Sequence, residues 1–165
     1  MSRSGAPMHD MIRPLAWLLG KWRAEGGGKG QYPTIKTFEY GEEVEFFHVG
    51  QPNVQFSLYS WNAESRKPLH REVGFIRIKP DSNKIALMSA HNFGVADIQE
   101  GEVKDNELKV ETAGIHRMSF SPDPETKKLS RTFQRKGDEM EQVLYMETSN
   151  TPLTEHLRIT YSKIE

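Results

Sequence analysis

The sequence contains no cysteine. This absence excludes disulfide bonds, thiolate metal sites, iron–sulfur clusters and a cysteine nucleophile. The sequence also lacks the run of about 18 apolar residues that a membrane-spanning helix needs, and its start lacks the apolar stretch of a signal peptide. We therefore expect an intracellular, soluble protein that resides in the cytoplasm or also in the nucleus.

The charges are nearly balanced: the sequence has 22 Lys and Arg residues and 23 Asp and Glu residues, which gives a formal net charge of −1. Proteins that bind nucleic acids usually present a basic stripe, so we expect neither a nucleic-acid nor a membrane partner. The three Trp, five Tyr and eight Phe residues exceed what disordered chains usually carry. The length of 165 residues suits a single domain. We expect a flexible tail over residues 1–7 and one folded domain over residues 8–165.

Helical periodicity is almost absent. Apolar residues cluster only between Met8 and Trp22, which predicts a short amphipathic helix interrupted by Pro14 and ended by Gly20. Trp22 is expected to plug one end of the fold. The run Gly26–Gly30 that follows predicts a flexible loop.

Short alternating runs with β-propensity fill the rest of the chain. Turn signals separate them, for example at Lys79–Asn83 and Ser121–Pro124. Because no helical segments lie between these runs, the pattern favours about eight to ten antiparallel strands over parallel βαβ units. A closed barrel is the simplest way to leave no sheet edge exposed, and a β-sandwich is the alternative. A barrel of this size can hold one small ligand.

The residues offer little conventional catalytic chemistry. The sequence has no Gly-x-Ser-x-Gly motif and no phosphate-binding loop. Carboxylate pairs such as Glu42–Glu43 are interpreted as solvated hairpin charges. Six histidines are present without the spacing of a structural zinc site: His9, His48, His70, His91, His116 and His156. The residues by themselves indicate an all-β container for an unidentified ligand.

Several multi-residue motifs resemble the nitrobindin family, and in particular the animal nitrobindin domain of THAP-type proteins. The similarity runs from about Pro14 to the C-terminus. The zinc finger of THAP-type proteins is absent, because the chain has no cysteine. The motifs include Leu18-Leu19-Gly20-Lys21-Trp22, Tyr32-Pro33-Thr34, Val49-Gly50-Gln51-Pro52, Pro68-Leu69-His70 and Pro152-Leu153-Thr154-Glu155-His156-Leu157.

The resemblance implies a ten-stranded antiparallel barrel of the lipocalin or fatty-acid-binding shape, with a short N-terminal helix and one haem b. It implies that His156 is the axial ligand of the haem iron. Leu69 stands where the family has a methionine on the distal side of the haem. The other residues that the family assigns to the haem pocket are Thr34, His70 and Met146.

The resemblance also implies a function. A ferric haem of this family isomerises peroxynitrite to nitrate and binds nitric oxide; the iron is the catalyst, and the chain supplies no acid or base. The alternative is a haem-free carrier of a fatty acid or another apolar ligand. The oligomeric state stays open, with a homodimer as one option. Strand alternation places His156 on the same face as Arg158 and Thr160, toward solvent, whereas the family motif places it at the haem.

Overall fold

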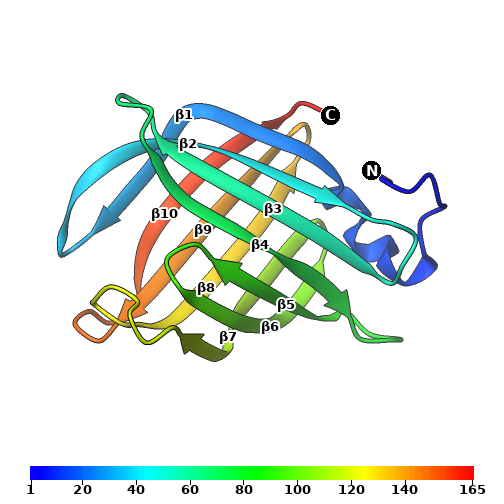
Figure 1. Cartoon of the computed structure of the whole chain (residues 1–165). Coiled ribbons are helices and arrows are strands. Elements are labelled where there is room, and N and C mark those ends of the chain that lie inside the picture. The colour runs from blue at the N-terminus through cyan, green and yellow to red at the C-terminus, as the bar shows by residue number, and fades with distance from the viewer.

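The computed structural model describes residues 1–165 and consists almost entirely of β-structure (Figure 1). One 3₁₀ helix, η1 (Asp10–Leu18), precedes ten strands. These strands close into an antiparallel barrel in which each strand pairs with the next one along the chain and β1 pairs with β10, so the predicted barrel is confirmed and the sandwich is not formed. The strands are β1 (Gly20–Tyr32), β2 (Ile35–Phe47), β3 (Asn53–Asn62), β4 (Pro68–Ile78), β5 (Lys84–His91), β6 (Val95–Lys104), β7 (Glu107–Arg117), β8 (Thr126–Lys136), β9 (Glu139–Thr148) and β10 (Thr154–Lys163).

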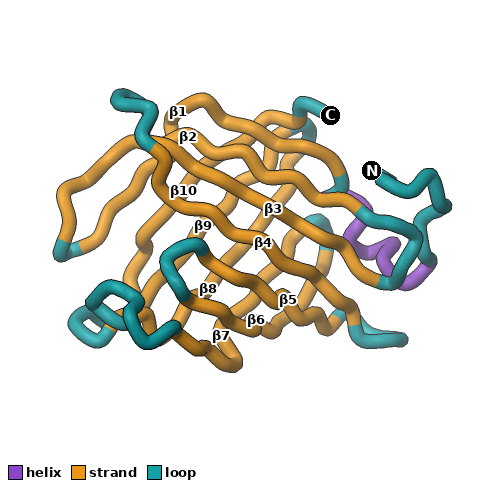
Figure 2. The backbone as a smooth tube through the Cα atoms, viewed as in Figure 1, coloured by secondary structure: helices purple, strands orange, loops and turns teal.

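The two ends of the barrel differ. Figure 2 shows η1 beside one end, with connecting loops gathered at both ends. Leu15 and Leu18 of η1 are fully buried, as is Trp22, whose indole Nε1 donates to the carbonyl oxygen of Leu18 at 2.8 Å. The helix and Trp22 therefore close this end, as predicted for Trp22. The β1–β2, β3–β4 and β9–β10 connections lie at the opposite end (Figure 1). With its nine residues η1 cannot span a bilayer, and the fold has no other helix.

The N-terminal segment contains one 3₁₀ helix and contacts the β2–β3 connection. The helix ends at Leu18, just before Gly20, which was predicted to end it; Gly20 begins β1, and Trp22, the last residue of the apolar cluster, pairs with Val44 of β2. His9 caps the helix by accepting a hydrogen bond from the backbone N–H of Met11. Within residues 1–7, expected as a tail, the backbone N–H of Arg3 donates to the carbonyl oxygen of His48 at 3.0 Å.

The glycine run Gly26–Gly30 lies in β1, so its prediction as a flexible loop was wrong. The strand pairs with β2 on one side and with β10 on the other, with a register shift between Ala24 and Gly28. A Cβ atom on Gly30 would overlap the ring of Phe38. The absent side chain therefore makes room for the ring of Phe38, which lies against Gly30 and lines the cavity. The need for this close approach comes from a partner strand and is invisible in the local sequence.

Alternation along the strands fills the barrel in three layers. Along β8, for example, Leu129 faces the open end, Arg131 lies in the middle and Phe133 belongs to the apolar core beside η1. The middle layer is polar although it is buried, which the sequence analysis did not predict; its carboxylate Glu42 was expected in solvent and is 2% exposed. The members of this layer include Glu42, Glu72, Ser89, Asp97, Gln99, Arg131 and Gln142.

Glu42 makes the stability of the fold sensitive to pH. Burial raises the pKa of its carboxyl group from 4.5 to about 7, although Tyr161 and Gln142 donate hydrogen bonds to it. Between these two pH values the folded chain keeps a proton that the unfolded chain releases. The free energy of unfolding should therefore fall as the pH rises from 4.5 to about 7, by up to about 3 kcal/mol.

Glu42→Gln should remove this dependence, because an amide does not ionise. The measurement is urea unfolding of the parent and of the variant between pH 5 and pH 8. The difference in the free energy of unfolding between the two proteins should shift in favour of the variant as the pH rises. A difference that stays constant over this range would show that Glu42 does not titrate there.

Candidate functional site

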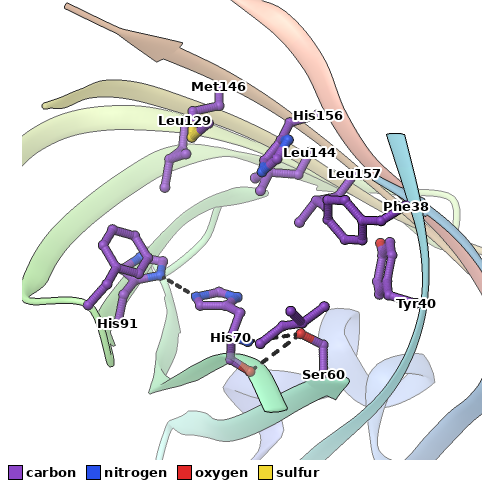
Figure 3. A pocket seen from close by; sticks show the side chains of 12 residues that line it. Phe38, Tyr40, Ser60, His70, His91, Leu129, Leu144, Met146, His156 and Leu157 are labelled. Carbon is purple, nitrogen blue, oxygen red and sulfur yellow. Dashed lines mark hydrogen bonds between the residues drawn. The ribbon is translucent and has the colours of Figure 1, made fainter. Parts of the chain in front are cut away.

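The open end of the barrel contains an apolar cavity (Figure 3). Its empty space, with the open solvent at the mouth included, is about 680 Å³. No Lys, Arg, Asp or Glu side chain lines it, and its polar groups come from histidine, tyrosine and serine. The lining residues are Phe38, Tyr40, Ser60, Leu69, His70, His91, Phe93, Leu129, Leu144, Met146, His156 and Leu157.

His156 reaches the cavity because β10 contains a β-bulge. In the pairing with β9, Glu155 lies opposite Tyr145 and Leu157 lies opposite Leu144, which leaves His156 as the extra residue. A bulge interrupts the strict alternation of side chains and re-aims one of them. As a result His156 and its neighbour Leu157 both line the cavity. The alternation that predicts a solvent-facing His156 therefore fails at this position.

Two residues of β1 orient the ring of His156. Its Nδ1 lies 3.1 Å from the carbonyl oxygen of Gln31, which can only accept, so Nδ1 carries the proton. The ring of Tyr32 packs edge-on against the imidazole, with 5.2 Å between the two ring centroids. Burial lowers the pKa of His156 more than this hydrogen bond raises it. The ring is thus neutral at neutral pH, and the lone pair of Nε2 is free to coordinate a metal.

The opposite wall carries two further histidines. In the closed order of strands, β4 and β5 lie across the barrel from β10, and Figure 3 shows His70 and His91 facing His156 across the cavity. Nε2 of His70 lies 2.9 Å from Nδ1 of His91. Burial is the main reason why the pKa of His70 falls to about 4, so this ring is neutral as well.

The structure brings together four of the five residues expected at the site. Leu69, His70, Met146 and His156 line the cavity. Thr34 lies in the exposed turn between β1 and β2 and is not among the lining residues, so its contact with a haem stays a prediction.

His91 and several apolar lining residues were not expected at the site from the sequence. Alternation along β5 was an available signal for His91, because Ile85, Leu87, Ser89 and His91 all face inward. The additional apolar lining residues could be assigned only once the barrel was closed: Phe38, Phe93, Leu129, Leu144 and Leu157.

Comparison with known proteins agrees with this geometry. Residues 11–163 match the family described as "THAP4-like, heme-binding beta-barrel domain". The chain belongs to this haem-binding family. The human protein named "Peroxynitrite isomerase THAP4" is 44% identical over 164 residues, which is 99% of this chain and 28% of that protein. The chain therefore spans about 28% of the length of this relative.

Relatives of similar length are also found within the haem-binding family. The Arabidopsis thaliana protein named "Peroxynitrite isomerase Rv2717c" is 34% identical, with 96% of this chain and 92% of that protein covered. The crystal structure of Rv2717c from M. tuberculosis superposes with a TM-score of 0.85 at 31% identity, covering 96% of this chain and all of the other. This chain and that crystal structure thus share the same fold.

The residues of the cavity fit the haem that characterises the family. An imidazole binds a haem iron through the free lone pair of its neutral form, and His156 presents one. The porphyrin requires apolar walls, which Phe38, Leu144 and Met146 contribute among others. The hydrogen bond from Nδ1 of His156 to Gln31 holds this ring from β1 and leaves its Nε2 for the iron, whereas the ring of His70 is held at Nε2 by His91.

Proposed function

We propose that this chain holds one ferric haem b through His156 and isomerises peroxynitrite to nitrate. The observation that carries the proposal is the bulge in β10, which turns a neutral imidazole with a free Nε2 into an apolar cavity. The names of the relatives support peroxynitrite as the substrate. Nitric oxide is the second ligand that we propose, since a haem held by His156 would supply an iron that can bind small ligands.

The chain itself positions the haem and excludes water from the cavity. His156 fixes the haem, and the hydrogen bond from its Nδ1 to Gln31 fixes the ring. When bound, the haem would supply an iron with Lewis-acid character toward the oxygen atoms of peroxynitrite. The reaction is an isomerisation, so the atoms and the charge of peroxynitrite are all retained in nitrate. Apolar walls keep the substrate out of bulk water until the rearrangement is complete.

A haem-free carrier of fatty acids is the alternative, and the cavity disfavours it. A buried carboxylate needs a partner that carries a positive charge or several hydrogen-bond donors. No lysine or arginine lines the cavity, and the buried guanidinium of Arg131 is already paired with Glu72 at 2.8 Å. The charged head of a fatty acid would therefore find no cationic partner within the cavity.

The test combines haem titration with stopped-flow kinetics. Haem-free protein titrated with ferric haem should give a saturable Soret band at one haem per chain. The loaded protein should accelerate the decay of peroxynitrite and increase the yield of nitrate over that of free haem. Saturable haem uptake with no acceleration would refute the isomerase proposal. Uptake of a fluorescent fatty acid in place of haem would support the carrier.

A further inference from the structure

His70 is connected to the buried polar layer by a series of side-chain hydrogen bonds. Its Nε2 lies 2.9 Å from Nδ1 of His91, and Nε2 of His91 lies 3.2 Å from Oδ1 of Asp97. The three residues belong to the adjacent strands β4, β5 and β6. The connection therefore runs along the barrel wall from the cavity into the polar layer, and the proposed function assigns it no role.

The carboxylate at the inner end decides where the proton of His91 lies. Asp97 accepts hydrogen bonds from Ser89 at 2.8 Å and from Gln99 at 2.9 Å. Burial raises the pKa of Asp97, but hydrogen bonds from His91 and Ser89 bring it below its ordinary value, so the group is ionised. A carboxylate cannot donate, and therefore Nε2 of His91 carries the proton that they share.

Glu72 favours the same arrangement. Its Oε1 lies 3.8 Å from Nε2 of His91, and this oxygen is buried without a hydrogen-bond partner. Its other oxygen is paired with Arg131. Two carboxylates thus surround the same nitrogen of His91, and the negative potential on that side of the ring disfavours a lone pair there.

The position of the proton on His91 determines the position of the proton on His70. A neutral imidazole carries one N–H and one lone pair. With a single proton, on Nε2, His91 accepts at Nδ1, so Nε2 of His70 must be the donor. This leaves Nδ1 of His70 with a lone pair. With one proton on each ring, every contact has one donor and one acceptor. Nδ1 of His70 has no hydrogen-bond partner in the protein, and the ring of His70 lines the cavity.

We infer that Asp97 and His91 hold His70 as a hydrogen-bond acceptor toward the cavity, so that the site favours ligands that present an O–H group. For the substrate of the proposed function, on which this part of the inference rests, the favoured form is peroxynitrous acid over its anion. Asp97 and His91 are positioning residues, because they act only through His70. The assignment of the ring proton depends on the protein alone and can be tested without haem.

The first test is nitrogen-15 NMR of the haem-free protein with labelled histidine at pH 7.5. Correlation of the ring nitrogens with the carbon-bound ring protons distinguishes a protonated nitrogen from one with a lone pair. His70 should carry its proton on Nε2 and have a lone pair on Nδ1, and His91 should show the same pattern. A proton on Nδ1 of His70 would overturn the inference. His70→Leu and His91→Phe assign the two sets of signals.

The second test compares the loaded parent with His70→Leu across a range of pH. The ratio of their rate constants for peroxynitrite decay should be largest at low pH, where the acid form prevails, at up to about tenfold for one hydrogen bond. It should approach one at high pH. A ratio that rises with pH would mean that His70 donates a hydrogen bond to the peroxynitrite anion. A ratio that does not change with pH would mean that His70 does not accept a hydrogen bond from the O–H group of peroxynitrous acid. Either result would overturn this part of the inference.

The two proposals fail in different ways. If the protein does not bind haem or does not isomerise peroxynitrite, the function is wrong, and the NMR spectra of the haem-free protein still decide the proton position. If haem binds and isomerisation proceeds while Nδ1 of His70 is protonated, only the inference about His70 is wrong. His116→Leu is the control for both tests, because His116 is exposed on β7 outside the cavity.

Discussion

Replacing His156 with alanine should weaken haem binding by at least about 100-fold and abolish the Soret band of the axial-histidine complex at micromolar protein. Loss of groups that merely orient a metal ligand already costs about 10- to 100-fold in affinity, and this substitution removes the ligand itself. His70 and His91 lie on the opposite wall and are hydrogen-bonded to each other, so neither is placed to bind the iron from the side of His156. Titration of haem-free protein with ferric haem, followed by absorbance, provides the measurement.

The haem-free variant should remain folded. His156 is half-buried, and it loses one hydrogen bond to Gln31 and the contact with Tyr32. We therefore expect a loss of no more than about 1 kcal/mol in the free energy of unfolding. His116→Ala is the matched control and should bind haem like the parent, since His116 is exposed outside the cavity.

Added imidazole distinguishes a lost ligand from a damaged pocket. His156→Gly leaves space into which free imidazole can diffuse, and millimolar imidazole should restore the spectrum if the only defect is the missing ligand. A His156→Ala protein that binds haem with the affinity and spectrum of the parent would show that the axial ligand is a different residue. The assignment of His156 would then have to be abandoned.

Replacing Arg131 with methionine should destabilise the fold by about 3–5 kcal/mol, which is the usual cost of leaving one charge of a buried pair without its partner. Arg131 is 1% exposed, and its guanidinium donates to Glu72 at 2.8 Å. Without it, the carboxylates of Glu72 and Asp97 face the interior with no cation of their own. Urea unfolding at pH 7.5 measures the loss.

The double variant Glu72→Gln/Arg131→Met should recover most of this loss, because it removes both charges of the pair. The control is Arg158→Met, the same substitution at an exposed arginine that pairs with Glu155 at 2.6 Å. That surface pair should contribute less than about 1 kcal/mol. If the two single variants lose the same stability, the buried pair has no special importance for the fold.

The loss caused by Arg131→Met should also depend on pH. In the parent, burial alone would raise the pKa of Glu72, but Arg131 brings it below its ordinary value of 4.5. The stability from this pair is therefore present above about pH 4.5 and lost in acid. In the variant the unpaired carboxyl should take up a proton more readily, so the difference from the parent should shrink as the pH falls from 8 toward 5.

Much of the fold was determined by the sequence itself. Alternating runs separated by turn residues predicted an antiparallel barrel, because a strand period of two and short hairpin connections are local properties. The motif around His156 indicated the ligand through its resemblance to a family. Local patterns failed at Gly26–Gly30, where glycine predicts flexibility and two neighbouring strands hold the segment in the sheet.

The tertiary structure alone decided which side chains meet inside the barrel. The bulge at His156 turns this residue inward, and it exists only as a mismatch in register between β9 and β10. The buried layer joins Glu72, Asp97 and Arg131 from three strands, each of which has an ordinary alternating sequence. A local pattern gives the spacing of side chains along one strand. Closure of the barrel sets their spacing across strands, and the charges, the cavity and the proton positions all depend on that second spacing.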